Sequence, residues 1–166
     1  LHKGVAAKDV MLHLLAQPFF RTSKGIGKVL EFAGDGVFSM PLDERATLTN
    51  MAVEAGGFTG ILEPDEVVVE YLAARRPKET KDSIRARIVR SDPGASYLET
   101  IEVDLDAVVP MVATPGDPRN GVPLSQVRQQ QGKVKVDIAY GGSCTGGKKA
   151  DMDMYAEVLK AALAKG

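Results

Sequence analysis

Apolar residues recur at helical spacing in several stretches of the 166-residue chain. Between residues 6 and 16, Val10, Met11, Leu14 and Leu15 share one face, which predicts an amphipathic helix. A second helix is expected to begin near Ser39 or Asp43, either of which can cap it, and to run to Ala55, before Gly56-Gly57. Further helices are expected from 63–66 to about 74, at 125–131, and after residue 148, where Met152, Tyr155, Ala156, Leu159 and Leu163 share a face.

Short apolar runs between these helices predict strands. The candidates are a buried strand at 29–33, one at 58–62, one at 97–105 with a solvated face, and one at 134–138. The charged run from Arg75 to Arg87 is expected to be a solvated, partly helical connection. Strands that alternate with helices predict a layered α/β/α architecture with a mainly parallel sheet.

A proline-rich segment suggests a division of the chain. Pro110 to Pro123 holds four prolines and two glycines, which is typical of a linker. We therefore expect an α/β domain over residues 1–112. Residues 113–166 would then form the linker and the first strand, loop and helix of a second α/β unit.

Composition narrows the functional classes. No apolar run reaches the roughly 18 residues that span a bilayer, so a soluble protein is expected. The net charge of −1 gives no electrostatic argument for binding nucleic acid or an anionic membrane. One cysteine excludes an internal disulfide and suits a reducing compartment, so we expect a cytoplasmic location. The start at Leu1, close to a structured stretch, suggests a piece of a longer protein.

The glycine-rich segment around Cys144 is the strongest candidate for chemistry. Four glycines flank this cysteine between a predicted strand and a predicted helix, and Lys148 and Lys149 follow it. A thiol near cations and a helix N-terminus favours the thiolate, which attacks carbon or binds metal. As a nucleophile it would need a histidine base, and His2 and His13, at the far end of the chain, are expected to be ordinary surface or partly packed residues. A small buried residue in a tight turn is the structural alternative.

The same segment can be compared with a phosphate-binding loop. Gly142, Gly147 and Lys148 fit the pattern G-x-x-x-x-G-K in a strand-loop-helix context. Lys149 stands where Ser or Thr would ligate magnesium, so the pattern is incomplete. A nucleotide- or phosphate-binding module that uses Gly142 to Lys148 is one alternative function, and a non-catalytic binding domain is another.

A polar stripe on the second predicted helix is the other candidate. Asn50 and Glu54 are four residues apart and Thr47 lies one turn earlier, so the three would share a helical face among apolar neighbours. The stripe could face solvent. Alternatively, it could direct an amide and a carboxylate into a cleft, where burial would raise the pKa of the carboxyl group.

Several segments together resemble the aconitase superfamily of iron–sulfur hydro-lyases. G-S-C-T at 142–145 resembles the first cluster-cysteine motif of that family, and R-A-T-L-T-N-M-A-V-E-A-G-G at 45–57 resembles its R-M-T-x-x-N-M-x-x-E-x-G-A signature. E-P-D-E at 63–66 is similar to A-P-D-E in the dehydratases, and V-L-E-F-A-G-D-G-V and D-P-G-A-S-Y are weaker matches. The resemblance runs in register from Gly4 to the C-terminal helix.

The resemblance implies a [4Fe-4S] cluster held by three cysteines, with one iron open to a hydroxy di- or tricarboxylic acid. By position, Cys144 matches the first cluster ligand, with Ser143 and Thr145 beside it in the cofactor-binding loop. Glu54 matches the acidic residue that hydrogen-bonds the water or hydroxyl at the cluster, and Asn50 matches the amide beside the cluster. The implied substrates are acids such as citrate or isocitrate, homocitrate or isopropylmalate, and the implied partners are the remaining domains or a small subunit.

Two departures from the family pattern bear on this expectation. Family members commonly follow Cys-Thr with Asn and then Ser or Gly, whereas Gly146-Gly147 stand here, so the loop lacks a side-chain amide. The other two cluster cysteines and the substrate-binding arginines of the family lie downstream of the matched region, and its catalytic histidines lie upstream. We therefore expect a central fragment of a hydro-lyase that is inactive by itself.

Overall fold

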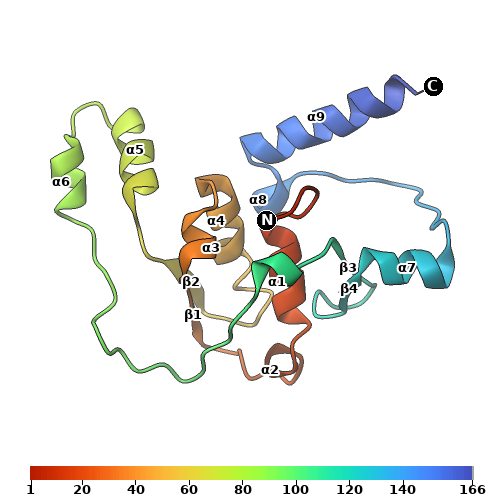
Figure 1. Ribbon diagram of the computed structural model, residues 1–166, viewed down its shortest axis with the longest axis horizontal. Helices are drawn as coiled ribbons and strands as arrows, with labels where there is room; N and C mark the ends of the chain where they lie inside the picture. The colour runs from red at the N-terminus through yellow and green to blue at the C-terminus, as the bar shows by residue number, and fades with distance from the viewer. Residues whose placement is uncertain (166) are drawn as a thin grey trace.

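The structure, a computed structural model, describes residues 1–165 and shows a mixed α/β arrangement (Figure 1). The helices are α1 (Ala7–Leu15), α2 (Pro18–Arg21), α3 (Asp35–Phe38), α4 (Leu42–Asn50), α5 (Glu66–Arg75), α6 (Lys81–Arg85), α7 (Leu124–Gln131), α8 (Ser143–Gly146) and α9 (Lys149–Leu163), with a 3-10 turn η1 (Leu105–Ala107). The strands are β1 (Val29–Phe32), β2 (Thr59–Leu62), β3 (Met111–Ala113) and β4 (Gly121–Pro123). The predicted α/β class is confirmed.

The strands form two small sheets. β1 and β2 are parallel, with Val29 opposite Thr59 and Phe32 opposite Leu62. β3 and β4 are antiparallel, with Met111 opposite Pro123. The prediction that the first strand is buried was wrong, because exposed and half-buried residues alternate along β1. A two-stranded sheet with one solvated face gives this alternation.

The hydrophobic core lies between α1 and α4. It consists of buried apolar residues of α1, α2 and α4 and of the loops beside them: Ala7, Val10, Met11, Leu12, Leu14, Leu15, Phe20, Met40, Leu48, Met51, Ala55 and Val108. Burial of each large apolar side chain contributes roughly 1.5–3 kcal/mol. Gly60 lets β2 pass close to α4, because a Cβ atom there would lie 2.8 Å from the Thr49 backbone. The α1 residues Val10, Met11, Leu14 and Leu15 all belong to the core, so the apolar face predicted for the first helix is confirmed.

Helix α4 is shorter than the sequence predicts. It begins after Pro41, without a side-chain cap from Ser39 or Asp43, and ends at Asn50 rather than Ala55. Separate turns follow as far as Gly56, whose φ of 76° is favourable only for glycine. The chain must reverse there so that β2 can return along α4, and this reversal ends the regular helix.

The expected strand at 97–105 was also wrong. The segment is extended and directs Ile101, Val103 and Leu105 onto the core, while Glu102 and Asp104 face solvent. The alternating pattern therefore predicted which side chains pack against the core. No strand of the described chain lies beside the segment to form a ladder, so the segment is not a strand. A second predicted strand, 134–138, likewise has no ladder.

The proline-rich segment forms structure instead of a plain linker. β3 and β4 pair across it and pack against α1. Its prolines occupy positions that do not need a ladder donor, since Pro110 precedes β3, Pro115 and Pro118 lie in the turn, and Pro123 ends β4. The division of the chain into residues 1–112 and 113–166 stays a prediction.

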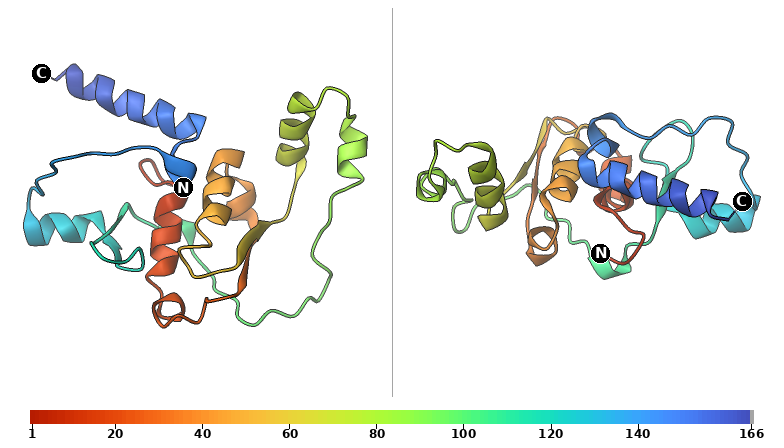
Figure 2. Two further views of the ribbon diagram at one scale, coloured as in Figure 1. Left: turned by 180° about the vertical axis from the view of Figure 1, so that it is seen from behind. Right: turned by 90° about the horizontal axis from the view of Figure 1, so that it is seen from above.

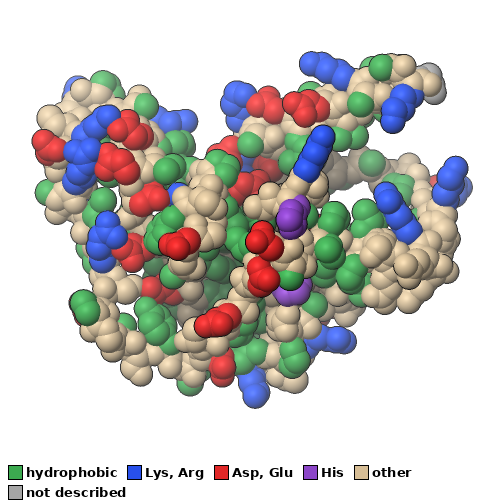
Figure 3. Space-filling model, viewed as in Figure 1, with side chains coloured by type: hydrophobic (Ala, Val, Ile, Leu, Met, Phe, Trp, Pro, Cys, Tyr) green, Lys and Arg blue, Asp and Glu red, His purple; other side chains and the backbone are tan. Residues whose placement is uncertain are grey.

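Two helical parts project from the core at opposite ends (Figures 1 and 2). At one end, α5 and α6 form a hairpin whose exposed acidic and basic side chains interleave, as Figure 3 shows. At the other end lie α7 and α9, the latter reached through α8. Within residues 1–165, no helix combines the length and the apolar character needed to cross a bilayer.

Candidate functional site

Cys144 lies in a tight loop that we call the cysteine loop, residues 141–148. Gly142 has a φ of 144° and Ser143 a φ of 72°, so the chain enters α8 through two consecutive residues with positive φ. For Ser143 this conformation carries backbone strain of roughly 1–3 kcal/mol. Cys144 follows on α8 and is exposed. The loop therefore presents the thiol at the surface, and the structural alternative of a buried small residue was wrong.

One stripe of α4 holds the cysteine loop. Thr145 donates its hydroxyl to Asn50 Oδ1 at 2.7 Å, and Thr47 donates to the Thr145 carbonyl at 3.4 Å. Asp43 accepts the backbone N–H of Ala150 at 3.3 Å. Positions 43, 47 and 50 share one helical face, which we call the α4 seam. The structure thus brings Asn50 and Thr145 together although 95 residues separate them.

The two lysines after the loop are paired with acids. Lys148 Nζ donates to the Thr145 carbonyl at 2.6 Å and lies 2.8 Å from Asp151 Oδ2. Asp151 also accepts the Lys148 backbone N–H at 2.9 Å, which caps α9. Lys149 donates to Asp153, and this hydrogen bond raises the pKa of the lysine. The positive surroundings expected for Cys144 are therefore largely neutralised.

Glu54 lies in the turns after α4 and not on the helix itself. Its Oε2 atom is buried and has no hydrogen-bond partner among residues 1–165. Thr47 is 4% exposed and Asn50 is half-buried, so the expected stripe does not simply face solvent. The common helical face predicted for Asn50 and Glu54 was wrong, because the regular helix ends at Asn50.

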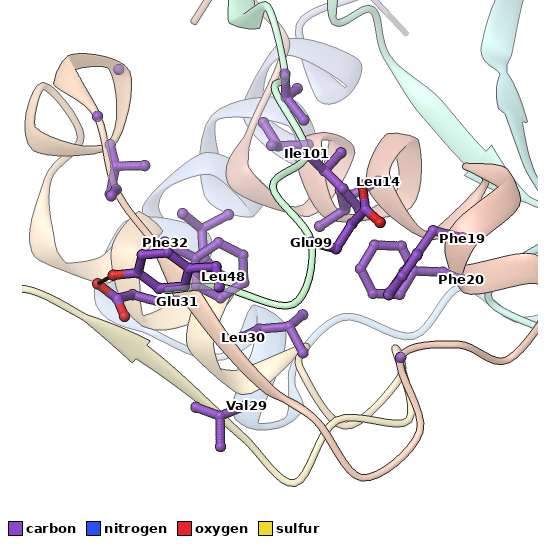
Figure 4. Close-up of a pocket in the computed structure, with 18 of the residues that line it drawn as sticks. Leu14, Phe19, Phe20, Val29, Leu30, Glu31, Phe32, Leu48, Glu99 and Ile101 are labelled. Carbon is purple, nitrogen blue, oxygen red and sulfur yellow. Dashed lines mark hydrogen bonds between the residues drawn. The ribbon is translucent and has the colours of Figure 1, made fainter. Parts of the chain in front are cut away.

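An apolar cavity lies elsewhere in the described chain. It measures about 590 Å³ and lies between β1 and the extended segment 97–105, with α1 and α2 at one side. Figure 4 shows Leu14, Phe20, Leu30 and Ile101 around it. None of the cysteine loop residues lines it. This apolar space is thus separate from the α4 seam.

The donor set near Cys144 decides what it could hold. The sequence contains one cysteine, and among the described residues no group of three or more His, Cys, Asp or Glu side chains is arranged around a metal ion. An exposed thiol on a strained glycine loop suits one corner of an iron–sulfur cluster. The buried, unpartnered carboxylate oxygen of Glu54 suits a hydrogen-bond acceptor for a group absent from the chain. The exposed thiol of Cys144 therefore fits one ligand position of a cluster.

Sequence reasoning missed four contributors to this site. Asp43 was considered only as a helix cap, and Lys148 only as a cation near the thiol and as part of a phosphate loop, not as a hydrogen-bond donor to the Thr145 carbonyl. Asp151 and Tyr155 were not considered as loop contacts, although Tyr155 donates its hydroxyl to the Gly146 carbonyl at 3.0 Å. The spacing of Asp43, Thr47 and Asn50 and the i, i+3 spacing of Lys148 and Asp151 were the available signals.

Comparison with known proteins identifies one family and relatives from that family. The sequence profile of the Aconitase family (aconitate hydratase) matches residues 1–166. The chain is 40% identical over 161 residues to 3-isopropylmalate dehydratase large subunit 2 of Rubrobacter xylanophilus, covering 96% of this chain and 35% of that protein. It is 38% identical over 160 residues to large subunit 1 of that dehydratase from Pyrococcus furiosus, again covering 96% and 35%. The chain therefore spans about a third of the length of these relatives.

Proposed function

Because this chain belongs to the aconitase family, we propose that it is a segment of an iron–sulfur hydro-lyase acting on a hydroxy di- or tricarboxylic acid. The names of the relatives favour isopropylmalate over citrate or homocitrate as the substrate. Their description as large subunits makes a small subunit the expected partner. The observation that carries the proposal is the hydrogen bond from Thr145 to Asn50, which joins the two motifs of the family resemblance.

Each site residue has a proposed part in this activity. Cys144 would supply one thiolate ligand of a [4Fe-4S] cluster, and the strained Ser143 and the anchored Thr145 would hold that thiolate in place. When bound, the cluster supplies a Lewis-acidic iron that polarises the substrate hydroxyl. Asn50 would orient the loop through Thr145. The unpartnered Oε2 of Glu54 would accept a hydrogen bond from the substrate hydroxyl. In hydration it would take the proton released by the added water, and in dehydration it would return a proton to the hydroxyl that leaves as water.

One thiolate cannot hold a cluster by itself, so the isolated chain is proposed to be inactive. Two further cysteine ligands would come from outside residues 1–166. A division at residues 112/113 would place the cysteine loop in a second unit and the α4 seam in the first. The active site would then lie at the junction of the two.

The test uses the complete protein that carries this segment, purified without oxygen together with its small subunit. In that protein Cys144→Ser is expected to abolish the visible absorbance of the cluster. Glu54→Gln is expected to keep the absorbance and to lower the dehydration rate by about 10²–10⁴-fold, the range for a lost acid–base group.

Glu70→Gln is the matched control, because Glu70 is an exposed carboxylate on α5 that pairs with Lys81. Its activity should equal that of the unchanged protein. Full activity of Glu54→Gln would remove the role proposed for Glu54. A full cluster spectrum in Cys144→Ser would remove the ligand role of Cys144.

The nucleotide-binding alternative receives little support. Lys148 is paired with Asp151 and with the Thr145 carbonyl, so its ammonium group is occupied within the loop. Titration of the chain with magnesium-ATP in a calorimeter should give no heat. Binding that disappears in Lys148→Ala would instead favour the phosphate-loop function.

A further inference from the structure

Two of the four glycines in the cysteine loop, Gly141 and Gly146, lie in close contact with Tyr155. A Cβ atom on Gly141 would lie 3.0 Å from the Tyr155 ring, and one on Gly146 would lie 2.9 Å from the Tyr155 hydroxyl. Real Cβ contacts are rarely this short, so both positions are effectively closed to side chains while the ring stays in place. The glycine composition of the loop is therefore explained in part by a residue of α9.

Tyr155 also bonds to the loop it covers. Its hydroxyl donates to the Gly146 carbonyl at 3.0 Å, and the residue is half-buried, unlike its exposed neighbours Met152 and Met154. One turn from the N-terminus of the same helix, Asp151 holds Lys148, which donates to the Thr145 carbonyl. Two successive carbonyls of α8 are thus bound by side chains, one from the N-cap residue Lys148 and one from Tyr155 in the second turn of α9.

We propose that Tyr155 is a positioning residue for Cys144, because its ring and hydroxyl fill the space beside Gly141 and Gly146 and fix the cysteine loop from the α9 side. The α4 seam fixes the loop from the other side through Thr145. Cys144 then lies between two anchored carbonyls and the strained Ser143. Any effect of this arrangement on catalysis rests on the proposed function. The positioning of the thiol by Tyr155 does not.

The first test is a double-mutant cycle in the full 166-residue chain, with Gly146→Ala, Tyr155→Phe and both changes together. The readout is the rate at which iodoacetamide alkylates the single cysteine, with far-ultraviolet circular dichroism as the check of the fold. Gly146→Ala is expected to raise the rate about fivefold, since the methyl group displaces the Tyr155 hydroxyl and breaks a hydrogen bond of about 1 kcal/mol.

The double-mutant cycle distinguishes a specific contact between Tyr155 and Gly146 from a non-specific loosening of the cysteine loop. Within 4 Å, a Cβ on Gly146 would meet only the Tyr155 hydroxyl, so Gly146→Ala should have less than about a twofold effect once Tyr155→Phe has removed that oxygen. Gly147→Ala is the matched control, because a Cβ there would lie 2.5 Å from the Ser143 carbonyl oxygen. Its effect should be the same in both backgrounds. Equal effects of Gly146→Ala with and without the Tyr155 hydroxyl would overturn the proposal.

The second readout connects the positioning role to the proposed cluster. In the complete protein, Tyr155→Phe should shift the electron paramagnetic resonance signal of the reduced cluster, while the Glu70→Gln control leaves it unchanged. If the effects of Gly146→Ala and Tyr155→Phe on the alkylation rate are coupled but the complete protein assembles no cluster, Tyr155 remains a positioning residue. The hydro-lyase function is then rejected. A cluster with an unaltered signal and a cycle without coupling would reject the role of Tyr155 alone.

Discussion

Arg45 is the most deeply buried charged side chain among residues 1–165, at 2% exposure. Its guanidinium donates to the Met40 carbonyl at 2.8 Å and to the Phe38 carbonyl at 2.6 Å, and Nη1 lies 2.8 Å from Asp65 Oδ1. Because Asp65 also caps α5, this one side chain connects α4 to the loop before it and to the start of α5. A buried cation that holds two carbonyls and one carboxylate is costly to remove.

Replacing this cation should destabilise the fold strongly. Arg45→Met is expected to lower the free energy of unfolding by about 3–5 kcal/mol, because it leaves two carbonyls and one partly buried carboxylate without a partner. Urea denaturation followed by circular dichroism measures this. Arg85→Met is the control, since Arg85 pairs with Glu66 at the surface, where solvent screening leaves such pairs little effect on stability. Similar losses for both variants would contradict the role assigned to Arg45.

The same ion pair predicts how stability depends on pH. The hydrogen bond and charge of Arg45 lower the pKa of Asp65 in the folded chain. A lowered folded pKa stabilises the fold above the unfolded pKa, about 3.9, and this contribution is lost as the pH falls through the folded value.

The variant that isolates this effect is Asp65→Asn, because asparagine can still cap α5 but carries no charge. Its unfolding midpoint in urea should change less than that of the unchanged chain between pH 5 and pH 2. An identical pH dependence in the two proteins would show that Asp65 does not carry the effect.

At the scale of elements, α1 and α9 differ sharply in burial although both are amphipathic. Six of the nine residues of α1 are buried, whereas Asp151 is the one buried residue among the fifteen of α9. Val158, Leu159 and Leu163 are exposed by 64%, 64% and 83%. Helices of this length depend mainly on packing of the apolar face, so the second half of α9 should be weakly held.

Hydrogen–deuterium exchange tests this difference directly. Amides of Val10 to Leu15 should exchange only with global unfolding, whereas those of Val158 to Leu163 should exchange through local opening, at least about 100-fold faster. Peptide-level mass spectrometry resolves the two segments. Equal protection of both helices would mean that α9 is covered by contacts that the structure does not contain.

The elements also show what periodicity can predict. Helix α1 and the helices near residues 66–75 and 124–131 follow from spacing and caps, because an amphipathic helix is specified locally. The segments 97–105 and 134–138 alternate as strands do, yet neither is one, because a strand also needs a neighbour's backbone groups beside it. Alternation therefore predicted the buried side of Ile101 and Val103 without predicting the sheet.

At the scale of the whole molecule, the site depends on contacts that local patterns do not encode. Glu54, Asn50 and Cys144 were selected as chemistry-bearing residues from their sequence neighbourhoods and from the family resemblance. The contact between Asn50 and Thr145 crosses most of the chain, and no local spacing predicts it. Tyr155 was assigned to an apolar helix face. The sequence did not indicate that its hydroxyl donates to the Gly146 carbonyl, because that contact depends on how the loop packs against the helix.

The extended segment 134–140 has a practical consequence for the isolated chain. Val134, Val136, Ile138 and Tyr140 are exposed by 53%, 66%, 86% and 83%, and the segment has unpaired backbone groups. Lys135 and Asp137 cancel each other's charge between them. A neutral, unpaired run of this kind is a template for strand addition by a second molecule.

We therefore predict that the chain aggregates as its concentration rises and that Asp137→Lys, which makes the segment cationic, suppresses this. Light scattering against concentration measures the effect. Asp92→Lys is the control, because it changes the net charge equally at an exposed position outside the segment. Equal suppression by both variants would assign the effect to net charge. Otherwise, the time for which the purified chain stays in solution depends on the seven residues 134–140, and a single added lysine extends it.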